Sequence, residues 1–114
     1  MSLDVNQLLS DIKSATSSVL DKDVSSFQGF SDRQLQAIAK QAEFVAIGIS
    51  TGQITEGSRD FFLDGLRDMT DSFVATLSGL AIIMVEKVWN AMVGAIWNAL
   101  SSATGLVLPV PTQR

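Results

Sequence analysis

The chain has 114 residues, a formal net charge of −4, and no Cys, His or Tyr. Its length fits one domain, and the missing residue types exclude disulfides and thiolate or imidazole metal sites. The acidic balance, with no cluster of Lys and Arg, argues against nucleic acid as a partner.

Charge is distributed unevenly along the chain. Residues 1–71 carry 11 acidic and 6 basic side chains, whereas residues 72–114 carry only Glu86, Lys87 and Arg114. We therefore describe residues 1–114 as a single helical domain with a charged helical part, 1–71, and an apolar helix and tail, 72–114. The apolar part must be buried against the chain's own first half, copies of itself, another protein, or lipid.

The first predicted helix covers residues 3–22. Val5, Leu8, Ile12, Ala15 and Val19 follow one another at steps of three and four, the spacing of a coiled-coil stripe. The run is short and has low helix propensity, so it needs a partner helix.

The second predicted helix covers residues 32–50. Ser31 and Gln34 have the spacing of a capping box, with Ser31 as the N-cap residue. Gly52 follows the end of this helix, as expected for a residue in the left-handed conformation at a C-terminal cap.

The third predicted helix begins after Thr55, its N-cap, and covers residues 56–102. Its apolar residues step by three or four without interruption, and a continuous helix of this length would be about 70 Å long. Either it breaks, most favourably at Ser78–Gly79, or the protein is elongated and oligomeric. The prediction is an all-α fold: an elongated helical hairpin or three-helix subunit with an extended tail that contains Pro109 and Pro111.

The apolar face of the third helix is the predicted oligomer interface. Small residues recur at intervals of four, which lets helices approach closely, and the sequence Trp-Asn-Ala occurs twice. The predicted interface residues are Phe73, Leu77, Leu80, Met84, Val88, Trp89, Asn90, Ala91, Ala95, Trp97, Asn98 and Ala99.

Catalytic chemistry has little support. Glu86 and Lys87 are the only charged pair in the apolar part, and adjacent helix positions point about 100° apart. Asp21 to Asp32 has the spacing of a calcium loop, but Ser26 stands where such a loop has Gly, and Asp32 where it has Glu. We therefore expect no enzymatic activity, no cofactor and no metal.

These features favour a non-catalytic structural or assembly protein that forms a homo-oligomer through its C-terminal helix, as a component of a larger particle such as a phage virion or a secretion machine. The alternative is a membrane-active protein, either a pore former or a conditionally inserting component. Val88 to Leu108 is uncharged and long enough to span a bilayer, although Asn90 and Asn98 dilute it. The N-terminus lacks a secretory signal, which leaves a cytoplasmic location or one within an assembled particle.

Overall fold

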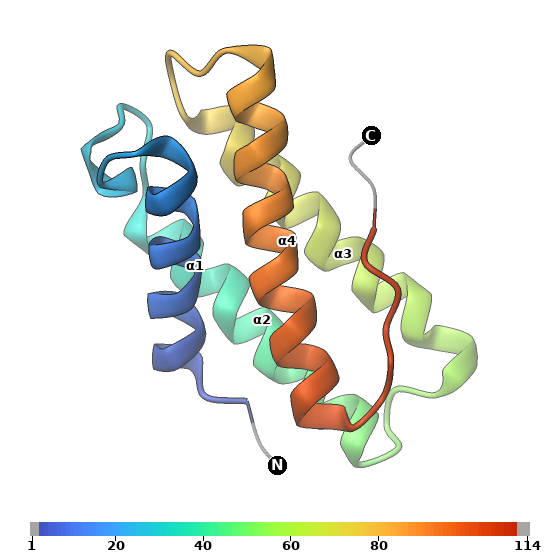
Figure 1. Ribbon diagram of the computed structural model, residues 1–114. Helices are drawn as coiled ribbons and strands as arrows, with labels where there is room; N and C mark the ends of the chain where they lie inside the picture. The colour runs from blue at the N-terminus through green and yellow to red at the C-terminus, as the bar shows by residue number, and fades with distance from the viewer. Residues whose placement is uncertain (1–2, 112–114) are drawn as a thin grey trace.

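The computed structural model describes residues 3–111; residues 1–2 and 112–114, at the ends of the predicted domain, lie outside this range. Figure 1 shows an all-α arrangement, which confirms the predicted fold class. The elements in the described residues are α1 (Val5–Leu20), the short 3₁₀-helix η1 (Val24–Ser26), α2 (Asp32–Ser50), α3 (Glu56–Thr76) and α4 (Ile82–Thr104).

The predicted helix 56–102 is two helices, so the predicted elongated hairpin or three-helix subunit is wrong. Helix α3 ends at Thr76, Leu77 is extended, and Gly79 has a φ of +83°. The chain therefore turns at Ser78–Gly79, the break point that the sequence favoured. The periodic apolar pattern concealed the turn because Leu77 and Leu80 keep the helical spacing while they lie in the connection.

The break makes the molecule much shorter than a continuous helix would allow. Its longest dimension is 41 Å and its radius of gyration is 13.7 Å. A compact domain of this length has an expected radius of gyration of about 13 Å. The four helices therefore form one compact bundle, in contrast to the predicted elongated subunit.

Helix α4 is the central element of this bundle. It packs against α1, α2 and α3, so most of its large apolar residues face another helix. A helix with several neighbours is apolar over a wider arc than a helix with one. The first half of the chain thus covers much of the apolar second half, through the buried α4 residues Val88, Trp89, Met92, Val93, Ile96, Trp97, Leu100 and Ala103.

The bundle consists of two helical hairpins with matching register. Helices α1 and α2 form one, helices α3 and α4 form the other, and equivalent positions lie 50 residues apart. Gly29 and Gly79 occupy the same place in the two turns, with φ values of +91° and +83°. Buried residues repeat at the same offset in the pairs Val24 and Val74, Ile38 and Val88, Ala39 and Trp89, Ala42 and Met92, and Ala46 and Ile96.

Local signals fix the helix ends. The backbone N–H of Gln34 donates to Oγ of Ser31 at 3.2 Å, and Ser31 is the N-cap of α2. Thr55 is the N-cap of α3, and its backbone N–H donates to Oγ of Ser58 at 3.1 Å. Gly52 lies two residues beyond the end of α2 with a φ of +80°.

Candidate functional site

The large residues of the predicted oligomer interface lie inside the monomer. Phe73, Leu77, Val88, Trp89 and Trp97 are each at most 5% exposed and belong to the bundle's own core. The bundle's own residues cover these side chains, and of the five only Trp97 also borders the surface depression described below.

The remaining residues of that interface divide into two groups. Leu80 and Met84 are half-buried at and after the turn that precedes α4. The others lie on the outward side of α4, where Ala91, Ala95 and Ala99 are half-buried, and Asn90 and Asn98 are exposed. The accessible part of the predicted interface is therefore mostly small or polar, with Leu80 and Met84 as its larger apolar members.

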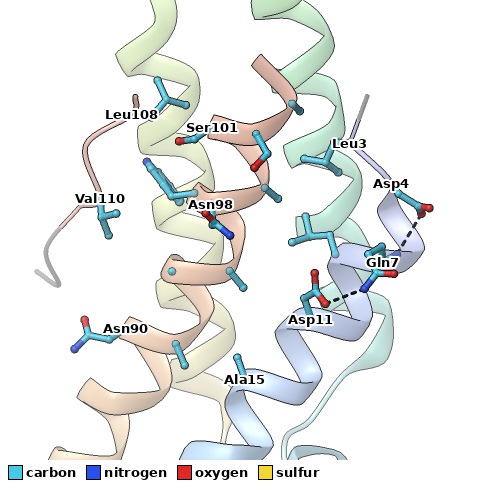
Figure 2. Close-up of a pocket in the computed structure, with 18 residues that line it drawn as sticks. Leu3, Asp4, Gln7, Asp11, Ala15, Asn90, Asn98, Ser101, Leu108 and Val110 are labelled. Carbon is cyan, nitrogen blue, oxygen red and sulfur yellow. Dashed lines mark hydrogen bonds between the residues drawn. The ribbon is translucent and has the colours of Figure 1, made fainter. Parts of the chain in front are cut away.

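This outward side of α4 forms the floor of a groove of about 880 Å³, which we call the α4 groove. Figure 2 shows that α1 contributes one wall, with Gln7, Asp11 and Ala15, while Leu108 and Val110 of the C-terminal segment lie on the other side. The floor residues are Asn90, Ala91, Gly94, Ala95, Asn98, Ala99, Ser101 and Ser102. The structure thus collects six of the predicted interface residues here, namely these two Asn and three Ala together with Trp97.

The floor of the α4 groove is low because its central side chains are small. A Cβ atom added to Gly94 would meet no other atom within 4 Å. This open space adjoins the outward side of α4, whose opposite side is packed against the bundle. The groove is therefore a surface depression of the folded bundle that does not extend into its core.

The α1 wall of the groove is acidic. Asp11 accepts a hydrogen bond from Nε2 of Gln7 at 2.9 Å, and Asp4 accepts from the backbone N–H groups of Asn6 and Gln7 at 3.0 and 3.2 Å. These bonds hold the Asp11 carboxylate beside the groove and the Asp4 carboxylate over the N-terminus of α1, at the end of the same wall. The lining residues that belong to the described part of the chain include Asp4 and Asp11 but no Lys or Arg, so their summed charge is negative.

A second exposed feature was missed by the sequence analysis. The ring centroids of Phe44 and Phe62 lie 6.2 Å apart, and those of Phe61 and Phe62 lie 5.4 Å apart. Phe44 and Phe61 are 56% and 76% exposed, and Ile47, one turn beyond Phe44, is 51% exposed. We call Phe44, Ile47, Phe61 and Phe62 the aromatic patch. Its sequence signal was available: Leu35, Ile38, Ala42 and Val45 form a helical stripe that is buried in α2, and Phe44 and Ile47 lie off that stripe.

Four buried nitrogen donors have no acceptor in the described part of the chain: Nε of Arg59 and Arg67, and Nε1 of Trp89 and Trp97. Buried Trp N–H groups usually find an acceptor, and leaving one unpaired costs about 1–3 kcal/mol. The burial of the two large apolar rings offsets this cost.

Few polar side chains are buried inside the bundle in residues 3–111. Thr16 and Thr70 are the buried polar side chains of residues 3–111, and each hydroxyl donates to a carbonyl one turn earlier in its own helix. Glu86 and Lys87 are exposed. Within the same range, no three acidic side chains lie close enough together to hold a metal ion.

Neither the α4 groove nor the aromatic patch can be assigned by likeness to a known protein. The chain matches no protein-family model, no curated protein and no solved structure.

Proposed function

We propose that this chain is a non-catalytic assembly protein that associates with copies of itself as a component of a larger assembly. The observation that carries the proposal is the aromatic patch. It presents two exposed Phe rings and an exposed Ile on adjacent helices α2 and α3. Contiguous apolar surface of this kind marks contact sites, and aromatic side chains contribute strongly to binding energy.

The surroundings of the aromatic patch favour a second copy as the occupant. Lys40 lies one turn before Phe44 on α2, while Asp60 and Asp64 flank Phe61 on α3. A twofold contact between two copies places each surface against itself, so unlike charges at the rim can pair across the axis. A patch with both positively and negatively charged side chains at its rim is suited to such a contact.

The absence of catalytic equipment is consistent with this role. The sequence contains no His, Cys or Tyr, and the buried polar groups of residues 3–111 serve their own helices. General acid or base chemistry would then depend on carboxylates or Lys at the surface.

Light scattering coupled to gel filtration tests the proposal. We expect a mass that is a multiple of 12.2 kDa for the wild type, and a shift towards the monomer for Phe61→Ser. Val107→Ser is the matched control, since Val107 is 96% exposed and lies outside the patch. A wild-type chain that stays monomeric at high concentration, or equal effects of the two variants, would overturn the proposal.

A specific observation also supports the membrane alternative. Ile82 and Ile83, at the start of α4, are 87% and 66% exposed, and residues 72–85 carry no charge. Such a tip could enter the boundary between headgroups and acyl chains. No helix in residues 3–111 combines the length and the apolar character needed to cross a bilayer. The membrane role proposed here is therefore surface attachment by this tip.

Vesicle flotation decides between these two candidates. Full-length protein is mixed with vesicles of neutral and anionic phospholipid, next to a variant that combines Ile82→Ser and Ile83→Ser. Flotation of the wild type that the double substitution abolishes would favour membrane attachment. Protein that stays in the aqueous fraction in both cases would exclude it.

A further inference from the structure

The α4 groove has the dimensions and surface of a helix-binding site. Its floor runs from Asn90 to Ser102, and at 1.5 Å per residue this is about 18 Å. Ala91, Gly94, Ala95 and Ala99 let another backbone approach closely. We propose that the α4 groove binds a cationic amphipathic helix of another protein. This inference goes beyond the proposed self-association, which uses the aromatic patch.

The walls favour a helical occupant over an extended one. An extended peptide binds by adding a strand to an open sheet edge or, as a polyproline helix, in an aromatic-lined groove. Residues 3–111 contain no strand, and the aromatic residue among those lining this groove, Trp97, is 2% exposed. A helix satisfies its own backbone groups and needs only a surface that fits its side chains. The groove offers apolar contacts along both sides, from Leu3, Leu8 and Ala15 on one side and from Leu108 and Val110 on the other.

The charge of the groove favours a basic partner. Asp4 and Asp11 stand on the α1 wall, and among residues 3–111 no Lys or Arg lines the groove. A helix with an apolar face and Lys or Arg along its edge would place those cations beside the two carboxylates. Complementary charge of this kind speeds association and selects against acidic partners.

The same features disfavour a second copy of α4 as the occupant. The floor is recessed between α1 and the C-terminal segment, so two grooves placed face to face would meet at their rims and leave a void. They would also bring Asp4 and Asp11 of both copies together in a chain of net charge −4. The groove needs a convex and positively charged partner.

Binding of a defined peptide tests the inference. The probe is a synthetic amphipathic helix of about 14 residues, long enough to cover the floor, with Leu and Ala on one face and Lys on the other. Its counterpart carries Glu in place of Lys, which has nearly the same helix propensity. We expect fluorescence anisotropy to show binding of the Lys peptide, at least about tenfold weaker binding of the Glu peptide, and loss of affinity with added salt.

Protein variants assign that binding to the groove. Gly94→Leu fills open space above the floor and should abolish binding, while helix propensity predicts an unchanged or higher melting temperature. The pair Asp4→Asn and Asp11→Asn removes the wall charge but keeps a side-chain acceptor at the N-cap of α1, and should weaken binding at least about fivefold. The pair Asp21→Asn and Asp71→Asn changes net charge equally, outside both the groove and the aromatic patch, and should leave affinity within about twofold.

Three results would overturn the inference: equal affinity for both peptides, no binding of either, or full affinity in Gly94→Leu. If Gly94→Leu instead dissociates an oligomer of the protein, the occupant is a second copy. Phe61→Ser should leave peptide affinity unchanged, so failure of the self-association proposal is distinguishable from failure of this one.

Discussion

The backbone N–H of Ser78 donates a hydrogen bond to the carbonyl oxygen of Gln28 at 2.9 Å. These residues lie 50 positions apart, in the equivalent turns of the two helical hairpins. The bond joins the α1–α2 connection to the α3–α4 connection and satisfies polar backbone groups that neither turn pairs internally. It also ties the break between α3 and α4 to the first hairpin, so the two turns form one end of the bundle.

The first prediction concerns Gly29, which lies beside this bond. Gly29 has a φ of +91°, and a Cβ atom there would collide with the carbonyl oxygen of Thr76. Gly29→Ala should therefore lower the free energy of unfolding by roughly 2–4 kcal/mol, through left-handed strain and overpacking. Urea denaturation measures this change. A loss below about 0.5 kcal/mol would mean that the two turns are not in close contact.

The second prediction compares Gly79 with Gly94. Gly79 has a φ of +83° in the turn before α4, whereas Gly94 is inside α4, and a Cβ on either would meet no atom within 4 Å. Gly79→Ala should destabilise by about 1–2 kcal/mol, and Gly94→Ala should stabilise by up to about 1 kcal/mol. The two thermal melts should shift in opposite directions. A stabilising Gly79→Ala would instead indicate a continuous helix through that position.

Sequence patterns predicted the local structure of the first half well. The second helix was predicted at residues 32–50 and is observed at Asp32–Ser50, because Ser31 and the residues after Ser50 carry strong end signals. The third helix begins at Glu56, directly after Thr55, as predicted. Capping is decided within a few residues, so the sequence is sufficient for it.

The long-range arrangement was not available from the same patterns. The spacing of apolar residues by three and four continues through Leu77 and Leu80, although the chain turns there. Such spacing shows which residues share a face of a helix, but not whether the helix is unbroken. The low charge of the second half is explained by tertiary packing, because α4 lies among three other helices that bury its apolar residues. For the candidate site, the small and amide residues of α4 were predicted, but the acidic wall from α1 was not, because it depends on how two distant helices pack.

The third prediction uses the acid sensitivity of Asp23. A hydrogen bond from the hydroxyl of Ser25 at 2.7 Å, and another from its backbone N–H at 2.9 Å, hold the pKa of Asp23 below its ordinary value of 3.8. Because the folded-state pKa is depressed, the carboxylate stabilises the fold above pH 3.8, and this contribution is lost as the pH falls through the folded-state value.

Melting temperatures of the wild type and Asp23→Asn should therefore differ at pH 6 and converge as the pH is lowered below 3.8. Ser25→Ala removes the hydroxyl donor and should reduce the same pH-dependent difference. If the gap between wild type and Asp23→Asn stays constant from pH 6 to strongly acidic conditions, these bonds do not favour the ionised carboxylate in solution.

The fourth prediction concerns two neighbours in the segment after α4. Leu108 is 6% exposed and Val107 is 96% exposed, so adjacent residues have opposite environments. Leu108→Ala should lower the free energy of unfolding by about 2–3 kcal/mol, since it removes a buried side chain, whereas Val107→Ala should change it by less than about 0.5 kcal/mol. Chemical denaturation of both variants measures the difference. Because Leu108 also lines the α4 groove, equal and small effects would show that this side of the groove is not packed onto the bundle in solution.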